Sequence, residues 1–252
     1  MAHSLADGYL NKSTIYDSAR PSYPTQAIEF IHRQLDLSCG LPVLDVGSGT
    51  GILTRQLAST GMPVIGVEPD AQMLATARMN TAATSAAFRC GTAERLGFAA
   101  DSVSALVCGQ SFHWFDPGKT QSEFRRVLAT NNPVFLVWNI RSPDCDEFHH
   151  AYEQLLCDQF ERYEETLQID QCLEDRIRKF FQGSIQECTF LNSQQLSEPG
   201  LLERTMSCSY AMQPGTAEYM SAICALSALY QQYGQKEGVS LNYRTRVVYG
   251  NI

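Results

Sequence analysis

Residues 43–57 read VLDVGSGTGILTRQL, and this stretch decides the fold. An apolar run at residues 43–46 leads into glycines at 47, 49 and 51, and a helical pattern follows at once from residue 52. Glycines at such a junction let the backbone turn sharply and let a ligand approach without interference from a Cβ atom. Free N–H groups at the start of the following helix favour an anionic group. The stretch therefore predicts a strand, a ligand-binding loop and a helix.

Short apolar runs and helical patterns continue to alternate through the first 140 residues. Further strands are expected at residues 64–67, 86–90, 103–108 and 134–139, and further helices at residues 70–79 and 117–128. Alternation of this kind implies right-handed crossovers and a parallel sheet. The predicted fold class is α/β: a Rossmann-like open sheet, mostly parallel, with helices on both faces.

The pattern changes after residue 140. Apolar residues from Phe148 to Tyr163 fall at helical spacing, and further helices are expected at residues 173–181 and 217–230. A strand is possible at residues 184–191, and residues 241–249 alternate as a strand does, which suggests a C-terminal antiparallel hairpin. We expect one domain over residues 1–252, divided into an N-terminal lid (1–35), a ligand-binding core (36–140), a helical cap with a hairpin strand (141–235) and a C-terminal strand (236–252).

Composition excludes several classes of protein. The 252 residues include 27 acidic and 19 basic side chains, a net charge of −8, which disfavours nucleic-acid binding by phosphate neutralisation. The nine cysteines form no C-x-x-C pair, so no metal site is expected and reduced thiols are. The N-terminus does not resemble a signal peptide, and no apolar stretch is long enough to span a membrane. We therefore expect a cytoplasmic protein with no membrane partner.

Two ligand classes use a glycine loop of this geometry. A dinucleotide site has the pattern G-x-G-x-x-G, whereas here the third glycine comes one residue early and Ile52 stands at the last position. Asp45, two residues before the first glycine, would repel a pyrophosphate but would suit an ammonium group. Glu68, at the end of the second expected strand, can accept both hydroxyls of an adenosine ribose. An amino acid joined to a ribose and adenine describes S-adenosylmethionine (SAM).

At these motifs the chain resembles the class I SAM-dependent methyltransferases. Within residues 103–115 the run QSFHWFD resembles the small-molecule branch labelled type 11, which includes trans-aconitate-methyltransferase-like proteins. The resemblance implies SAM as cofactor, methyl transfer as activity and a small molecule as substrate, with transfer to a carboxylate or hydroxyl oxygen expected. It implies cofactor contacts at Asp45, Gly47, Ser48, Gly49, Glu68, Pro69, Met73, Thr92, Ala93, Glu94 and Gln110. Thr92 stands where the family usually has an acid that takes the adenine amino group.

The N-terminal pattern from Tyr16 to Pro24 resembles the segment of this branch that folds over the cofactor. Arg20 is a candidate to pair with a carboxylate of the cofactor or of the substrate. We expect the remaining candidates to contact the substrate: Tyr16, Tyr23, Ser111 and Trp114. His113, at the end of an expected parallel strand, is the candidate catalytic base, although it could equally hold the cofactor or the loop by a hydrogen bond.

Two other functions remain open at this stage. A module that binds SAM or S-adenosylhomocysteine (SAH) without transfer would use the same loop. An NAD-type oxidoreductase is argued against by Asp45 and by the glycine spacing. Sequence alone does not identify the methyl acceptor or the oligomeric state.

Overall fold

The computed structural model describes residue 17 and residues 19–81, 86–143, 145–181 and 185–252. The chain divides into two compact units, and each is described by itself. The core unit comprises Ser22–Asn139, Cys172–Phe190 and Thr245–Ile252. The helical unit comprises Met1–Pro21, Ile140–Gln171 and Leu191–Arg244.

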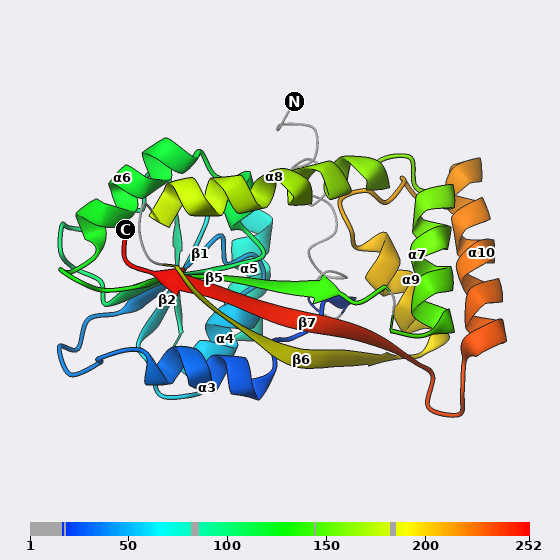
Figure 1. Cartoon of the computed structure of the whole chain (residues 1–252), viewed down its shortest axis with the longest axis horizontal. Coiled ribbons are helices and arrows are strands. Elements are labelled where there is room, and N and C mark those ends of the chain that lie inside the picture. Colours follow the sequence, from blue (N-terminus) through cyan, green and yellow to red (C-terminus); the bar gives the residue numbers. More distant parts are fainter. Residues whose placement is uncertain (1–16, 18, 82–85, 144, 182–184) are drawn as a thin grey trace. The chain divides into compact units, whose positions relative to one another are not determined.

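A seven-stranded sheet runs through the chain in the order β3-β2-β1-β4-β5-β7-β6, and its C-terminal strands are antiparallel (Figure 1). The expected α/β class and the mixed, mostly parallel sheet are therefore confirmed. The strands are β1 (Val43–Val46), β2 (Val64–Glu68), β3 (Ala87–Cys90), β4 (Ala105–Gly109), β5 (Val134–Arg141), β6 (Gln186–Leu196) and β7 (Val239–Gly250).

Register brings the important strand ends to one edge of the sheet. The parallel neighbours of β1 are β2 and β4, and Asp45 lies opposite Gly66 on β2 and Val107 on β4. The residues that follow β1, β2 and β4 therefore leave the sheet at the same edge, where parallel α/β sheets bind ligands.

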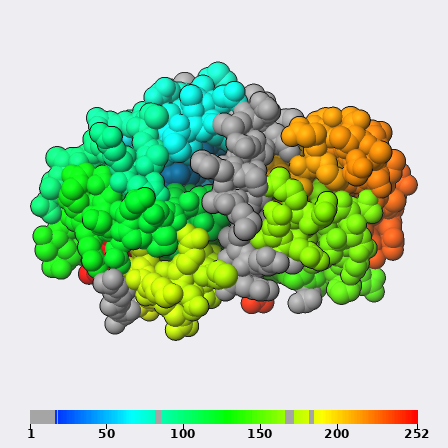
Figure 2. Space-filling view, turned by 90° about the horizontal axis from the view of Figure 1, so that it is seen from above, coloured from blue at the N-terminus to red at the C-terminus, as the bar shows by residue number. Residues whose placement is uncertain are grey.

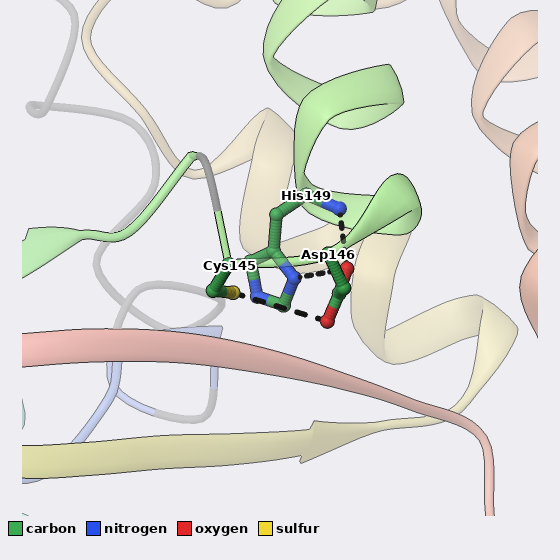
Figure 3. A group of neighbouring side chains, drawn as sticks. All are labelled: Cys145, Asp146 and His149. Atoms are coloured by element: carbon green, nitrogen blue, oxygen red, sulfur yellow. Dashed lines mark hydrogen bonds and ion pairs between the residues drawn. The ribbon is translucent and has the colours of Figure 1, made fainter.

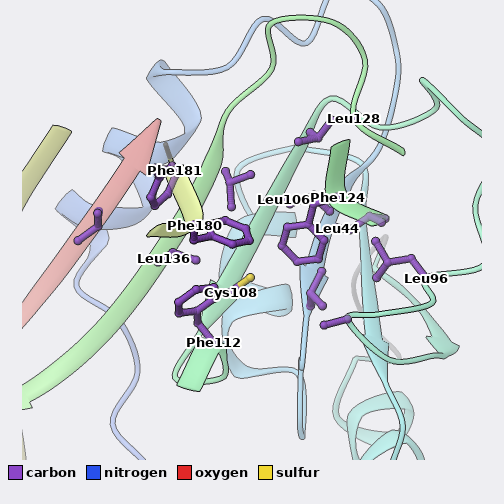
Figure 4. Packing of buried hydrophobic residues seen from close by; sticks show 14 of the residues in the cluster. Leu44, Leu96, Leu106, Cys108, Phe112, Phe124, Leu128, Leu136, Phe180 and Phe181 are labelled. Carbon is purple, nitrogen blue, oxygen red and sulfur yellow. The ribbon is translucent and has the colours of Figure 1, made fainter. Parts of the chain in front are cut away.

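Helices cover both faces of the sheet in the core unit. Side chains of a buried strand alternate between faces, so Leu44 and Leu106 join one hydrophobic cluster, and Val43 and Val107 join the other. The first cluster includes Phe124 and a pair of aromatic side chains at the end of α8 (Figure 4). The helices are α3 (Thr25–Arg33), α4 (Ile52–Ala58), α5 (Ala71–Asn80), the short 3-10 helix η1 (Phe112–Trp114), α6 (Pro117–Val127) and the second half of α8 (Tyr163–Phe181).

The helical unit has its own hydrophobic cluster, rich in aromatic side chains such as Tyr152, Phe160 and Tyr243. Its helices are α7 (Glu147–Gln159), the first part of α8, α9 (Glu198–Met206) and α10 (Ala217–Tyr233). Helix α10 packs against α7, and the two present adjacent surfaces in the space-filling view (Figure 2). None of the described helices combines the length and the apolar character needed to cross a membrane.

Four details differ from the sequence expectation, and the first is helix α3 (Thr25–Arg33), which was not predicted. The helix expected over residues 148–163 ends at Gln159, because Phe160 takes an extended conformation (φ −121°, ψ 92°), and α8 then begins at Tyr163 and runs to Phe181. Both Phe160 and Tyr163 remain buried in the same cluster, so their helical spacing reflected burial rather than one continuous helix. Helix α9 was not predicted. The strand expected over residues 184–191 extends to Leu196.

Candidate functional site

The glycine loop between β1 and α4 is held in a conformation that favours glycine. Gly47, Gly49 and Gly51 all have positive φ angles, of 71°, 55° and 81°. A Cβ atom at position 47 would lie 2.5 Å from the Cβ of Ser111, and one at position 51 would lie 2.8 Å from Cζ of Phe88. A Cβ atom at Gly49 would meet nothing within 4 Å. The first and third glycines therefore allow close packing, and the second borders open space that a ligand can enter.

Asp45 is a buried acid with an unused acceptor. Its side chain is 1% exposed, and Oδ2 accepts a hydrogen bond of 2.6 Å from the Thr54 hydroxyl. Oδ1 is buried and accepts no hydrogen bond from the residues that the structure describes. Burial, with a smaller contribution from the nearby Glu68, raises the pKa of Asp45 to about 7. The side chain thus lacks a donor, and an ammonium group would supply one.

Glu68 connects the end of β2 to the glycine loop. Its Oε2 accepts the backbone N–H of Gly49 at 2.9 Å, and its Oε1 accepts the backbone N–H of Asp70 at 3.0 Å. The side chain is 9% exposed, and burial raises its pKa. Each carboxylate oxygen has a second lone pair, so hydroxyl groups of a ligand can still be accepted.

The residues expected around an adenine ring follow β2 and β3. Asp70 caps α5, where its Oδ1 accepts the backbone N–H groups of Gln72 and Met73, each at 2.8 Å. The side chain of Met73 is buried by this turn. The remaining expected contacts differ in exposure, and they are exposed Pro69 and Thr92, buried Ala93 and partly buried Glu94. Glu94 accepts the backbone N–H of Asp116 at 2.9 Å, which joins this segment to the start of α6.

Two hydrogen bonds hold the segment after β4 to the neighbouring strands β5 and β1. Gln110 has a positive φ of 56°, which is uncommon for a residue other than glycine, and its side chain donates to the Asn139 carbonyl at 3.1 Å. The Ser111 hydroxyl is buried and donates to the Val46 carbonyl at 2.7 Å. Ser111 was expected to contact substrate, but its hydroxyl proton is used to hold the end of β1.

His113 lies in η1 with its ring 4.8 Å from the ring of Trp114. Burial, together with the nearby Arg176 guanidinium, lowers the pKa of His113 to about 4. Arg176, on α8, donates to the Phe115 carbonyl at 2.6 Å. His113 is therefore neutral at pH 7 and is a weak base. A buried indole N–H, that of Trp138 near the end of β5, has no acceptor among the described residues.

Comparisons with known proteins agree with this geometry. Residues 44–136 match the family described as "Methyltransferase domain". A Mycobacterium tuberculosis protein named as an uncharacterized methyltransferase is 38% identical over 126 residues, which cover 50% of this chain and 49% of that protein. A Schizosaccharomyces pombe protein with a name of the same kind is 34% identical over 127 residues, covering 50% of each. The chain spans about half the length of the curated relatives it matches.

Residues 44–136 of this chain are therefore similar to a methyltransferase domain. Solved structures show the same fold over a greater length. A structure from Anaeromyxobacter dehalogenans named as a type II methyltransferase aligns with a TM-score of 0.62 at 18% identity, covering 92% of this chain and 97% of that one. A methyltransferase structure from Anabaena variabilis aligns with a TM-score of 0.62 at 19% identity, covering 90% and 97%.

The N-terminal candidates fall in three places. Tyr23 is buried in the core unit, where its backbone N–H and carbonyl bond the Gln56 side chain on α4 at 2.9 and 2.7 Å. Its hydroxyl lies against Gly109 at the end of β4, since a Cβ atom there would be 2.7 Å from the hydroxyl oxygen. Arg20 belongs to the helical unit and donates to the Ser207 carbonyl at 3.2 Å. Tyr16 lies outside the described residues.

One group in the helical unit has the composition of a metal site, and it is formed by Cys145, Asp146 and His149 (Figure 3). The backbone N–H of Asn242 donates to Nε2 of His149 at 2.8 Å, so the ring proton must be on Nδ1. Nδ1 in turn donates to Oδ1 of Asp146 at 2.7 Å, and the same oxygen accepts the backbone N–H of His149. Both ring nitrogens are therefore occupied, Nδ1 by the Asp146 cap of α7 and Nε2 by the backbone of β7.

Four residues that contact the candidate residues or their neighbours were not among the sequence candidates: Thr54, Gln56, Trp138 and Arg176. Thr54 and Gln56 follow the loop on α4, so their position was predictable although their partners were not. Trp138 lies on an expected strand and was not proposed as a contact. Arg176 was not predicted, because it lies far from the cofactor motifs in sequence. It belongs to the part of α8 that is in the core unit.

Proposed function

We propose that this protein transfers a methyl group from SAM to a carboxylate oxygen of a small molecule. The cofactor assignment rests on the unused, buried Oδ1 atom of Asp45 on β1 and on the open space at Gly49 in the loop that follows. SAM bears an ammonium group, and the geometry of the loop fits it.

The residues that hold the cofactor are proposed from these positions. Asp45 accepts the ammonium group, and the ionised carboxylate that this needs is favoured by the positive charge of the ligand itself. Gly49 lets the methionine part approach the backbone, and Glu68 accepts the ribose hydroxyls. Residues 69–73 and 92–94 surround the adenine. When bound, SAM supplies a methyl group activated by its sulfonium, so that positioning of the acceptor can provide much of the rate.

The acceptor atom is proposed from the state of His113. Removal of a proton from a hydroxyl group is helped by a base whose pKa lies near the working pH. The pKa of His113 is about 4, so a hydroxyl acceptor would receive little help. A carboxylate is already ionised and needs no base. The guanidinium of Arg176 beside His113 and the unused N–H of Trp138 are groups that favour a carboxylate.

We also propose that the helical segment over residues 141–235 selects the acceptor, because its sequence contains none of the cofactor motifs. Exchange of this segment with that of a related methyltransferase should change the acceptor used and leave SAH affinity within about twofold.

Calorimetric titration with SAH tests the cofactor assignment. We expect micromolar binding by the wild-type protein, loss of binding in Asp45→Ala and Glu68→Ala, and no binding of NAD. Glu29→Ala, which removes an exposed acid of α3, is the matched control and should bind normally. Binding of NAD, or SAH affinity unchanged in Asp45→Ala, would refute the assignment.

A second measurement tests the transfer step. Isotope-labelled SAM is incubated with separate panels of carboxylic acids, phenols and amines. Label in a base-labile ester product supports carboxylate methylation, and label only in phenols or amines contradicts it. SAH binding without label in any panel supports a binding module in place of a transferase.

A further inference from the structure

The interior of the helical unit contains a buried guanidinium without a carboxylate partner. Arg204, on α9, is 4% exposed. Its Nε donates to the Tyr243 hydroxyl at 3.1 Å, and its Nη1 donates to the Cys208 sulfur at 3.0 Å. Among the described residues, no acidic side chain forms an ion pair with it. A buried charge is costly unless an opposite charge or strong acceptors compensate it, and this one has only a hydroxyl and a thiol.

A second guanidinium lies in the same cluster. Arg141, at the end of β5, bonds the hydroxyl of Tyr163 and reaches Glu153 at 3.4 Å. Both Arg141 and Arg204 act electrostatically on Tyr152, which places the two charges around one group of side chains. Among the described residues these two guanidiniums share one carboxylate, that of Glu153, so Arg204 lacks a carboxylate partner. The Arg141 side chain is 18% exposed, so this side of the cluster reaches solvent.

The cluster also has more donors than acceptors. The Thr205 hydroxyl donates to the Leu201 carbonyl, so the Tyr152 hydroxyl must donate to Thr205 and offers no proton elsewhere. Within the part of the chain that the structure describes, two buried donors form no well-oriented hydrogen bond: Nε of Arg141 and the hydroxyl of Tyr210, which lies near the Cys208 thiol and helps to lower its pKa. Buried polar groups are normally satisfied, and unsatisfied donors beside an uncompensated charge indicate a missing acceptor.

The lowered pKa of the Cys208 thiol also indicates positive charge in this cluster. Burial alone would raise its pKa, but the guanidiniums of Arg20 and Arg204 outweigh burial and hold the pKa of Cys208 below its ordinary value. The Cys208 sulfur lies 3.0 Å from Nη1 of Arg204, and sulfur is a weak acceptor.

We propose that Arg204, Arg141 and Tyr210 form a binding site for the carboxylate group of a small molecule. A planar carboxylate can accept two hydrogen bonds from a guanidinium and a third from a tyrosine hydroxyl. A carboxylate would supply the acid that Arg204 lacks among the described residues. The proposal goes beyond the methyl transfer proposed above, because it rests on the helical unit alone and predicts binding in the absence of SAM.

The test is the thermal stability of the full chain in sodium benzoate and sodium succinate, compared with sodium chloride at equal ionic strength and without SAM. We expect both carboxylates to raise Tm in a saturable way. Arg204→Met should weaken the apparent affinity at least tenfold. It should not lower Tm in chloride, because it replaces an uncompensated charge with an apolar side chain of similar length. Arg244→Met, at an exposed arginine of the same unit, is the matched control and should respond as the wild type does.

Tyr210→Phe keeps the ring and removes only the unsatisfied hydroxyl, so it tests the site should Arg204→Met fold poorly. We expect unchanged Tm in chloride and a several-fold weaker response to carboxylates. The proposal is overturned if the wild-type Tm is the same in carboxylates and chloride, or if Arg204→Met and Tyr210→Phe respond to carboxylates as the wild type does. A large loss of Tm in both variants in chloride would instead make the cluster a structural network.

Discussion

Asp45 is a residue at which stability and ligand binding make opposite demands. Its pKa of about 7 in the folded protein exceeds the value of about 3.9 in an unfolded chain, so the folded state holds the proton more tightly. Below pH 4 Asp45 is protonated in the folded protein and costs no stability. As the pH rises toward 7, the free energy of unfolding therefore falls. Three pKa units correspond to roughly 4 kcal/mol, an upper bound for the cost of the buried carboxylate above pH 7. Such an unfavourable group indicates a binding role.

Asp45→Asn should consequently stabilise the protein at pH 8 by about 2–4 kcal/mol, because the amide is neutral and can still accept from Thr54. The same variant should lose SAH affinity at least tenfold. Urea denaturation at pH 8 and pH 4 measures the first effect, which should disappear at the lower pH. Equal destabilisation at both values would show that Asp45 is an ordinary structural acid.

Cofactor affinity should also depend on pH through this residue. A ligand ammonium requires the ionised carboxylate, so below pH 7 binding must first remove a proton. We expect the dissociation constant of SAH to rise by up to tenfold per pH unit below 7. Titration calorimetry from pH 5.5 to 8.5 measures the slope. In Asp45→Asn the dependence should be flat, and a flat wild-type profile would contradict the pKa.

At the scale of single elements, the glycine loop separates packing from ligand access. Gly47 has the Ser111 side chain against it, whereas Gly49 faces open space. Gly47→Ala should cost about 2–4 kcal/mol, because a clash adds to an unfavourable positive φ. Gly49→Ala carries only the positive φ and should cost about 1–2 kcal/mol while it reduces SAH affinity more than tenfold. Denaturation and calorimetry on the pair distinguish the roles, and the idea fails if both variants lose stability equally.

The start of α7 offers a separate test in the helical unit. Oδ1 of Asp146 accepts from both the backbone and the ring of His149, so Asp146→Ala should destabilise this unit by about 1–2 kcal/mol. Asp146→Asn keeps an oxygen in place and should lose less than half as much. Hydrogen exchange in α7 detects the change. Stabilisation of the wild type by added zinc that is lost in Asp146→Ala would show that the cap is a metal site.

Local pattern predicted the elements where it agreed with burial. The strands β1, β2 and β4 are short, mostly buried and mostly apolar, and the loop glycines are dictated by local backbone geometry, so both could be predicted. The break between α7 and α8 was not, because Phe160 and Tyr163 are buried on either side of it. Helix α9 was missed although Ser197 caps it, since its few apolar residues show little periodicity.

For the whole molecule, the sequence predicted the proposed SAM site but not the proposed carboxylate site. Residues that follow the parallel strands meet at one edge by topology, so the cofactor residues could be predicted together. Arg204 and Arg141 lie 63 positions apart and come together only through the tertiary packing of the helical unit. No local pattern distinguishes a buried arginine from a surface one. The Arg176 contact with Phe115 was hidden for the same reason.

The two proposed ligands should protect different parts of the chain. In hydrogen exchange, SAH should slow exchange at residues 45–51 and 66–73 of the core unit, and benzoate should slow it at residues 141–156 and 201–210 of the helical unit. Protection of both sets by benzoate alone would show that it occupies the cofactor site as well. Asp45→Asn should abolish only the first pattern, and Arg204→Met only the second.

The hydrogen bond from Ser111 to the Val46 carbonyl joins the segment that precedes His113 to the strand that carries Asp45. A shift of either segment must therefore strain the other. If SAM binding orders the loop, it also orders η1. SAM and an acceptor that orders η1 must then raise each other's affinity by the same factor. Ser111→Ala keeps the packing against Gly47 but breaks this connection. Cofactor and acceptor should then bind independently, so the affinity of each should not depend on whether the other is already bound.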